Sequence, residues 1–360
     1  MYDLNKPINF HIELTDQCNA RCPLCPRNII EDGRLKEHPN LKNSSITIDQ
    51  FKNIFKDYQQ QTDKVLFSGN FGDPIFNSDI CEIIEYTSSN VINHASIYRF
   101  PITICTNGGF RSPSWWKTLA EKFPNICVIF SIDGLEDTHH LYRVNTRYER
   151  VVENARAFIN AGGYADWSFI KFGHNEHQEE EARRRASEFG FHRFHTVTSQ
   201  RFKKDQGEFI WGNTSYKISD VKPKGFREIK NKLNQQTYNL FHDKKNLQIE
   251  QELEVAKTIT CEELDHNRVY IDCEGHLYPC CWLGSKAYNK RNNTRQIYNE
   301  DHIMEYRSED KVWEKSFLDI LNDDWFQYLL PISWQHKPCD TCAQQCGKYI
   351  HKTYRDNHAV

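Results

Sequence analysis

Three cysteines near the start of the chain are spaced so that their thiolates can converge. Cys18, Cys22 and Cys25 follow a C-x3-C-x2-C pattern, directly after an alternating apolar segment. Structural zinc sites usually have four protein ligands, whereas a metal site that performs chemistry keeps one position open. Cysteine thiolates are also the usual ligands of iron–sulfur clusters. Three cysteines on four irons would leave one iron free to bind a small molecule, so the loop predicts a reactive metal centre.

This loop resembles that of the radical S-adenosylmethionine (SAM) superfamily, of which the spacing is a hallmark. The resemblance implies that Cys18, Cys22 and Cys25 hold a 4Fe–4S cluster whose open iron chelates SAM. It also implies that an electron from the cluster cleaves SAM to a 5′-deoxyadenosyl radical, which abstracts hydrogen from a substrate. Leu24 departs from the family, where an aromatic residue often precedes the third cysteine. The alternatives are a zinc loop and cysteines that are merely buried.

The elements that must position this loop alternate between strand and helix. Strands are predicted over 8–14, 64–69, 102–106, 127–132, 167–172 and 191–197, and helices over 47–58, 78–93, 114–123, 146–161 and 176–190. Thr47 with Gln50 and Thr146 with Glu149 form capping boxes at two helix starts. Residues 31–45 are polar and are expected to be irregular.

This alternation implies βα units around a parallel sheet with right-handed crossovers. A full eight-fold barrel takes about 250 residues, so six units predict an incomplete barrel, in agreement with the partial barrel of the radical SAM family. The predicted fold class is α/β: a partial (β/α)6 TIM-type barrel followed by a small cysteine-rich β-hairpin and helix domain. The expected domains are the barrel over 1–198, a linker and lid segment over 199–260, and the cysteine-rich domain over 261–360.

Polar motifs follow the predicted strands at the end where barrel enzymes hold their active sites. Gly72 and Asp73 occupy the place of the family's Gly-Gly-Glu-Pro motif, which receives the SAM amino group. A carboxylate suits an ammonium group through charge-assisted hydrogen bonds. Here Asp replaces the commoner Glu and one glycine is displaced, and the bare Gly-Asp-Pro sequence is also an ordinary turn.

The resemblance implies further SAM contacts from the same rim. Thr106 and Asn107 would contact the ribose of SAM, and Ser131 and Asp133 would contact the ribose and the carboxylate. Arg143 would bind the carboxylate, and Asn175 would approach the nucleoside. The alternative for Arg143 is a surface salt bridge.

A second group of cysteines lies near the C-terminus. Cys261 precedes Gly275 and Cys280, around a hairpin predicted from 268–272 and 276–278, and Cys339 and Cys342 follow later at C-x2-C spacing. This arrangement resembles the twitch domain, a shortened SPASM domain, and implies that Cys261, Cys280, Cys339 and Cys342 hold one auxiliary 4Fe–4S cluster. Four thiolates would close the site, which fits electron transfer or a structural role. Cys346 is an alternative ligand, Cys273 and Cys281 are left over, and a zinc ribbon is the alternative for the whole group. Cys81, Cys105 and Cys127 are expected to be inert core residues.

Length, charge and cysteine count limit the classes of protein to which the chain can belong. The chain has 360 residues, a net charge of −3 and 13 cysteines. No apolar run reaches the roughly 20 residues of a membrane helix, and the N-terminus lacks a signal-peptide pattern. We therefore expect a cytoplasmic protein whose clustered cysteines bind metal rather than form disulfides.

These observations together predict a radical SAM enzyme that performs a net oxidation or modification, with the auxiliary cluster accepting an electron or holding the substrate. The substrate would be a small molecule or a peptide, and an electron donor such as flavodoxin or ferredoxin would be needed. A peptide-modifying maturase is the alternative among enzymes, although the chain opens directly into the first strand, which disfavours a leader-guided modifier. A zinc-stabilised nucleic-acid-binding module is the alternative from another class, and the near-neutral charge counts against it.

Overall fold

The structure is a computed structural model that describes residues 2–58, 62–93, 98–199, 201–202, 207–221, 259–285, 308–336 and 340–346. Two compact units divide the chain. The barrel unit comprises Asn9–Lys222 and Ile271–Gly275, and the C-terminal unit comprises Met1–Ile8, Pro223–Tyr270 and His276–Val360. Among the described residues, no helix has the length and apolar character needed to cross a membrane.

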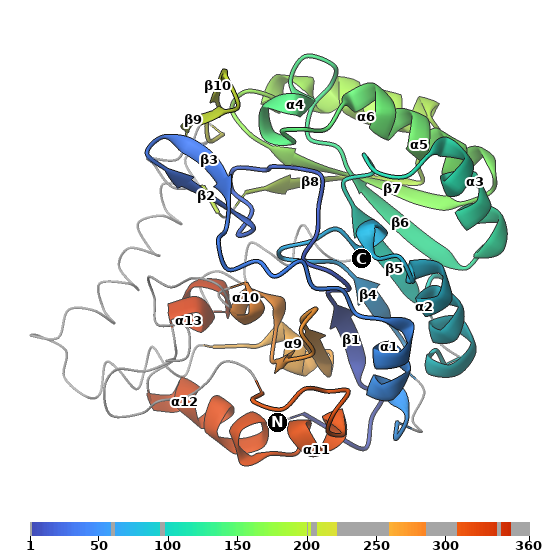
Figure 1. The fold of residues 1–360 in the computed structure, drawn as a ribbon, viewed down its shortest axis with the longest axis vertical. Coiled ribbons are helices and arrows are strands. Elements are labelled where there is room, and N and C mark those ends of the chain that lie inside the picture. The colour runs from blue at the N-terminus through green and yellow to red at the C-terminus, as the bar shows by residue number, and fades with distance from the viewer. Residues whose placement is uncertain are drawn as a thin grey trace, which may run out of the picture. The chain divides into compact units, whose positions relative to one another are not determined.

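The barrel unit is built on a curved sheet of parallel strands. In sheet order these are β1 (Asn9–Ile12), β4 (Val65–Phe67), β5 (Ile102–Thr106), β6 (Ile126–Ser131), β7 (Tyr164–Lys171) and β8 (Arg193–Thr198). Along the outer side of this sheet lie α1 (Ile48–Phe55), α2 (Ile80–Tyr86), α3 (Pro113–Lys122), α5 (Tyr148–Asn160) and α6 (Glu179–Glu188) (Figure 1). Among the described strands, β8 ends the sheet and does not pair with β1, so the sheet is open. The predicted α/β fold with a partial barrel is therefore confirmed.

Short helical segments connect these elements. They are η1 (Pro74–Phe76), η2 (Thr87–Val91), which continues α2 as a π-turn, α4 (His139–Tyr142) and η3 (Glu176–Gln178).

Alternation along the strands separates an apolar outer face from a more polar inner face. On β7, Trp167 and Phe169 are fully buried, and Trp167 packs against Phe191 of the following segment with ring centroids 5.3 Å apart. Phe10 of β1 similarly packs on Phe55 of α1, at 5.0 Å. Each such side chain stabilises the fold by about 1.5–3 kcal/mol through burial. Successive side chains on a strand point to opposite faces, so the intervening polar residues face the barrel interior.

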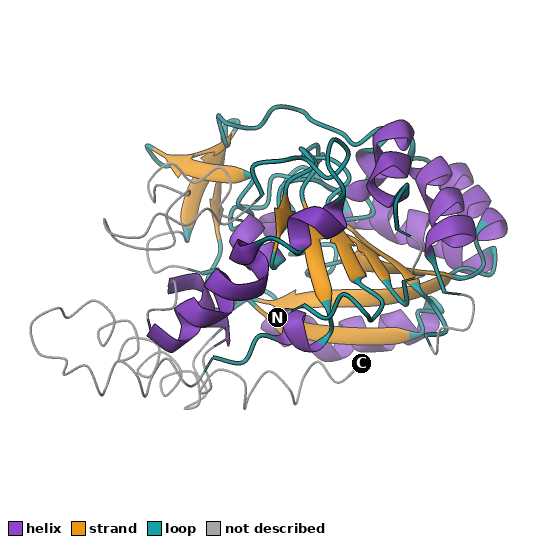
Figure 2. Cartoon of the chain, turned by 90° about the horizontal axis from the view of Figure 1, so that it is seen from below, coloured by secondary structure: helices purple, strands orange, loops and turns teal. Residues whose placement is uncertain are grey.

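A second sheet belongs to the same unit and was not expected. It pairs β2 (Asn28–Glu31), β3 (Arg34–Glu37), β9 (Glu208–Trp211) and β10 (Thr214–Lys217) in the order β10-β9-β3-β2 (Figure 2). The expectation of irregular structure over 31–45 was wrong for residues 31–37, because Asp32 and Gly33 adopt positive φ values of 52° and 72° and close a tight hairpin. An Asp-Gly pair is a recognised signal for such a turn. Residues 38–45 are irregular apart from an isolated bridge at Ser45. The described part of the predicted linker contributes β9 and β10.

The two predicted capping boxes had different outcomes. Thr47 and Gln50 form a complete capping box at the start of α1, as predicted. At the start of α5 the N-cap is Arg147 without a side-chain cap, so the second box was wrong. The Thr146 hydroxyl instead donates to Arg143 O at 2.6 Å and lies 3.0 Å from His139 Nε2. Two groups just upstream in the chain thus outcompete the capping position for this hydroxyl.

The C-terminal unit is small and mostly helical. Its elements are α9 (Glu262–Asp265), β11 (Arg268–Ile271), β12 (Leu277–Tyr278), α10 (Cys281–Gly284), α11 (Phe317–Leu321), η4 (Trp325–Leu329), α12 (Leu330–His336) and α13 (Asp340–Cys346). β11 and β12 are adjacent, as the predicted hairpin requires. A core of Tyr270, Tyr278, Leu283 and two cysteines, Cys280 and Cys342, holds these elements together.

Candidate functional site

The N-terminal cysteine loop follows the C-terminal end of β1 and is packed against the second sheet. Cys22 and Leu24 share an apolar cluster with Leu35 of β3 and Phe209 of β9, and Cys18 and Cys25 flank the cluster. All three cysteines are free thiols, with Cys22 buried and the other two half-buried. The second sheet therefore supports the cysteine loop through this apolar cluster.

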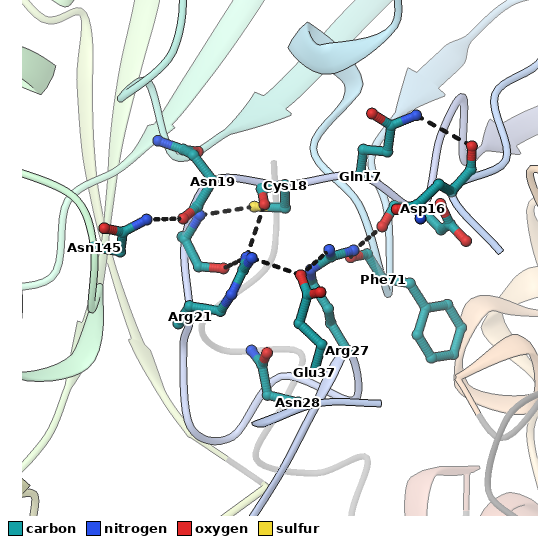
Figure 3. Close-up of polar contacts among 12 residues, drawn as sticks. Asp16, Gln17, Cys18, Asn19, Arg21, Arg27, Asn28, Glu37, Phe71 and Asn145 are labelled. Carbon is teal, nitrogen blue, oxygen red and sulfur yellow. Dashed lines mark hydrogen bonds and ion pairs between the residues drawn. The ribbon is translucent and has the colours of Figure 1, made fainter. Parts of the chain in front are cut away.

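Two arginines and one glutamate hold the backbone of this loop (Figure 3). Arg27 is 3% exposed, and its Nη1 donates to Phe71 O at 3.3 Å in the turn after β4. Arg21 Nη1 donates to Cys18 O at 2.9 Å. Glu37 of β3 accepts from both guanidinium groups, at 2.6 Å from Arg21 and 2.5 Å from Arg27. The loop is thus shaped by charge-assisted contacts that do not involve its sulfur atoms.

Two asparagines fix further carbonyl groups of the loop. Asn28 Nδ2 donates to Cys22 O at 3.0 Å, and Asn145 Nδ2 donates to Asn19 O at 2.8 Å. Together with the arginines, these amides hold the cysteine loop in one conformation through contacts within the protein alone.

The sulfur atoms of Cys18 and Cys22 face donors that suit thiolates, whereas Cys25 Sγ donates to Asn70 O at 3.2 Å. Ala20 N and Asn107 Nδ2 lie 3.3 and 3.4 Å from Cys18 Sγ, and Arg143 Nη1 lies 3.7 Å from Cys22 Sγ. Burial raises the pKa of Cys22 to about 11, with Arg143 opposing the shift. Metal binding displaces thiol protons. Three thiols on one loop, two of them facing N–H donors, are a donor set that fits an iron–sulfur cluster.

The predicted Gly72-Asp73 motif is tied to both β1 and β5. Glu13 is 1% exposed, and its Oε1 accepts from Phe71 N at 2.6 Å and Gly72 N at 2.9 Å. The other end of the turn is fixed through Asp73, whose Oδ2 accepts from Thr106 Oγ1 at 3.0 Å and Asn107 N at 2.7 Å. Burial raises the pKa of Asp73, and these donors oppose the shift. Four of the predicted rim residues therefore lie in one hydrogen-bonded network.

Asp133 and Arg143 form a buried ion pair beside the cysteine loop. Arg143 Nε lies 2.6 Å from Asp133 Oδ2, with side-chain exposures of 14% and 0%. The second carboxylate oxygen accepts from Ile170 N at 2.6 Å. Although burial disfavours the charged guanidinium, Asp133 and Cys22 raise the pKa of Arg143 above its ordinary value. The surface salt bridge considered for Arg143 is thereby excluded.

The two remaining predicted SAM contacts, Ser131 and Asn175, differ in burial and in how far their side chains are engaged in other hydrogen bonds. Ser131 ends β6 and is half-buried. Asn175 is fully buried, and its amide is used within the loop after β7: Nδ2 donates to Ile170 O at 2.9 Å and Oδ1 accepts from Phe172 N at 2.7 Å. Their contacts with SAM stay predictions.

Sequence reasoning missed the residues that position this rim. Glu13 was not singled out, although it holds the turn before Asp73. Arg27 and Glu37 were not singled out. The one available signal was a charged residue, Glu13, on a strand that leads directly into the cysteine loop.

The C-terminal cysteines surround a cavity of about 60 Å³. Four of them line it: Cys261, Cys280, Cys342 and Cys346. Cys339 lies outside the described residues. A hydrogen bond shared by the two thiols lowers the pKa of Cys261 and raises that of Cys346. Trp334 also lines the cavity, and its buried Nε1 has no hydrogen-bond partner among the described residues.

Thiol donors and a buried N–H donor around one cavity fit an iron–sulfur cluster. No group of three or more His, Cys, Asp or Glu side chains in the described ranges is arranged to hold a single metal ion. Each thiolate of a four-iron cluster binds a different iron and does not require such convergence.

The other cysteines among the described residues do not line this cavity. Cys273 is buried in the barrel unit and Cys281 is half-buried. Burial raises the pKa of Cys105 to about 11 and also raises that of Cys127. These values agree with the expectation of unreactive thiols.

Comparison with known proteins gives one family match and several similar structures. The family model described as "Radical SAM superfamily" matches residues 12–186. SuiB from Streptococcus suis superposes with a TM-score of 0.53 at 14% identity, covering 88% of this chain and 66% of SuiB. The chain thus spans just under two thirds of that relative. AdoMet-bound anSMEcpe gives a TM-score of 0.56 at 16% identity, covering 98% of this chain and 92% of that one. No curated protein sequence matches the chain.

Proposed function

We propose that this chain, whose residues 12–186 match the radical SAM family model, is an enzyme that reductively cleaves SAM and abstracts hydrogen from a substrate. The observation that carries the proposal is the arrangement of Cys18, Cys22 and Cys25 on one loop beside the network of Asp73 and Asn107. The donor set suits a 4Fe–4S cluster with one open iron.

When bound, the cluster would supply the electron that converts SAM to methionine and a 5′-deoxyadenosyl radical. Asp73 would receive the SAM ammonium group, because Oδ1 accepts only Ile75 N, at 3.2 Å, among the contacts described, and a carboxylate oxygen has room for a further donor. Arg143 would bind the SAM carboxylate. The nucleoside would lie against Thr106, Asn107, Ser131, Asp133 and Asn175.

We further propose an auxiliary 4Fe–4S cluster in the C-terminal cavity. Cys261, Cys280 and Cys342 would be ligands, with Cys339 or Cys346 as the fourth. The unpartnered Nε1 of Trp334 supports this assignment, because a buried N–H would gain an acceptor from a cluster sulfur. The auxiliary cluster would accept an electron from the substrate or help to hold it.

The substrate is proposed to be a small molecule or a peptide, oxidised or modified with electrons supplied by a flavodoxin or ferredoxin. A peptide-modifying maturase is the second candidate. It is favoured by two similar structures: SuiB bound to its precursor peptide SuiA, and anSMEcpe bound to AdoMet and a Cp18Cys peptide.

The first experiment counts metal and tests SAM cleavage. Anaerobically purified and reconstituted protein should contain about eight irons per chain, from two four-iron clusters. With dithionite and SAM it should release 5′-deoxyadenosine. A protein that holds only zinc, or that leaves SAM intact, would contradict the proposal.

The second experiment separates the two sites. Replacing Cys18, Cys22 and Cys25 with Ala should abolish SAM cleavage and leave about four irons per chain. Loss of all iron would refute the assignment of two independent sites.

The fourth auxiliary ligand can be identified with matched variants. Cys339→Ala and Cys346→Ala are compared by iron content and visible absorption. The variant that falls to about four irons per chain identifies the ligand. If both variants keep about eight irons, the four-thiolate site is wrong.

A further inference from the structure

A side-chain amide lies against the sulfur of the first cysteine. Asn107 follows β5, is 4% exposed, and places its Nδ2 at 3.4 Å from Cys18 Sγ. Its orientation is fixed from the other side, because Asn107 Oδ1 accepts from Gly109 N at 2.8 Å. The N–H groups of the amide are therefore held toward the cysteine loop.

The side-chain NH2 group of Asn107 faces more hydrogen-bond acceptors than it has hydrogens to donate. Besides Cys18 Sγ, Nδ2 faces Asn19 Oδ1 at 2.9 Å and Asp73 Oδ2 at 2.7 Å. An asparagine NH2 carries two hydrogens. Three acceptors therefore share two protons. A change in the hydrogen bonding of Asp73 alters how strongly the Asn107 amide donates to the sulfur of Cys18.

We propose that Asn107 is a positioning residue that sets the reduction potential of the cluster held by Cys18 and couples that potential to the occupancy of Asp73. The inference rests on the proposed function. A hydrogen bond to a cluster sulfur favours the reduced state, which carries one more negative charge, and so raises the potential.

The coupling follows from the shared protons. An ammonium group bound at Asp73 Oδ1 would draw negative charge away from Oδ2, weaken the contact between Oδ2 and Asn107 Nδ2, and so leave one Asn107 N–H for Cys18 Sγ. Bound SAM would then favour the reduced cluster through Asn107. By linkage, reduction would strengthen SAM binding by the same factor.

Redox titration followed by electron paramagnetic resonance tests the first part. The barrel cluster is identified as the signal that is missing in Cys18→Ala. In Asn107→Ala, full-length and reconstituted, the ratio of reduced to oxidised barrel cluster at a fixed potential should fall about tenfold, which corresponds to about 59 mV for one electron. The SAM-induced change in this ratio should also shrink.

Asn145→Gly is the matched control. It removes a second side-chain amide that contacts the same loop but donates to Asn19 O and not to sulfur, and glycine accepts the φ of 68° at this position. Its potential should equal that of the wild type. A comparable shift in Asn145→Gly would mean that loop disorder, not the N–H···S contact, sets the potential, and would overturn the inference.

A measurement on the wild-type sequence covers the case in which Asn107→Ala fails to assemble the cluster. Protein labelled with ¹⁵N in the side-chain amide of asparagine should show a ¹⁵N hyperfine coupling to the reduced barrel cluster. Absence of this coupling, or an unchanged potential in an iron-replete Asn107→Ala, would overturn the inference. A wild-type protein without barrel iron would instead refute the proposed function.

Discussion

Arg143 is the side chain that joins the cysteine loop to the end of β6. It pairs with the buried Asp133 and lies within 3.7 Å of Cys22 Sγ. Its ring neighbour Tyr142 lies 5.4 Å away, under the guanidinium group. Removing one partner of a buried pair leaves an uncompensated charge, so a neutral replacement would cost stability as well as binding. A charge-conserving replacement separates these effects.

Arg143→Lys should weaken SAM binding. Lysine keeps the charge but lacks the planar fork with which arginine holds two acceptors. Loss of one charge-assisted hydrogen bond, about 1.5 kcal/mol, should raise the SAM dissociation constant about tenfold. Equilibrium dialysis of SAM against the reconstituted protein measures the change.

Arg150→Lys serves as the control for this substitution, because Arg150 pairs with Glu153 on the surface and should leave SAM binding unaltered. An unchanged affinity in Arg143→Lys would show that Arg143 is not a SAM contact.

At the scale of elements, the turn after β4 is the part that brings the cysteine loop to the rim. Asp73 N donates to Gln17 O at 2.8 Å, so the turn and the loop share a backbone hydrogen bond. Gly72 permits this approach, because a Cβ placed there would lie 1.8 Å from Thr15 O. The glycine is required for packing and not for a left-handed backbone.

Gly72→Ala should therefore displace the cysteine loop. We expect a loss of more than 4 kcal/mol in the free energy of unfolding, together with loss of the barrel iron. Urea unfolding and iron analysis measure the two effects.

Gly33→Ala is the comparison, since Gly33 has φ +72° but no atom within 4 Å of an added Cβ. Backbone strain alone should cost it about 1–2 kcal/mol and leave the iron content intact. Equal losses in the two variants would contradict the packing argument.

Helix α4, which begins at His139, is the subject of a second prediction at this scale. His139 is fully buried, and burial lowers its pKa to about 3, with Arg143 contributing. The unfolded chain binds this proton below about pH 6.5, whereas the folded protein does not until about pH 3. Stability should therefore fall by up to about 1.4 kcal/mol per pH unit as the pH drops below 6.5.

Urea unfolding at pH 7.5 and pH 5 tests this dependence in the wild type, in His139→Gln and in the exposed neighbour variant His140→Gln. The acid-induced loss should shrink by about 2 kcal/mol only in His139→Gln. Equal losses in all three proteins would exclude His139 as the source.

At the scale of the whole molecule, the chain has two compact units, each with its own set of cysteines. The barrel unit contains Cys18, Cys22 and Cys25, and the C-terminal unit contains the cysteines that line the cavity. Neither set draws a described ligand from the other unit. The two proposed clusters should therefore assemble independently.

Cys280→Ala tests this independence from the auxiliary side. The variant should keep about four irons, because the barrel ligands are intact. It should still release 5′-deoxyadenosine from SAM and dithionite. If SAM cleavage is lost while the barrel iron remains, the two sites are coupled.

Much of the fold is readable from the sequence, because it depends on local patterns. Alternating apolar residues and helical spacing located β5 at its observed bounds and the other barrel strands within a few residues. The Thr47 capping box is correct because both partners lie within four residues. The cysteine spacing alone identified the loop that the family match covers.

Other features depend on contacts that the local sequence pattern does not report. The Thr146 box failed because the hydroxyl instead contacts Arg143 O, three residues upstream, and His139 Nε2, seven residues upstream. The second sheet joins residues near 30 to residues near 210, and no local period reports such pairing.

The cysteine loop shows the same division. The sequence determined that three thiols share one loop at the end of a strand. Only the tertiary structure decided what surrounds them: the Glu37 bridge, the Arg143 guanidinium and the Asn107 amide come from three other elements. Hydrogen bonds depend on distance in space, and the chain brings these groups together only when the barrel has formed.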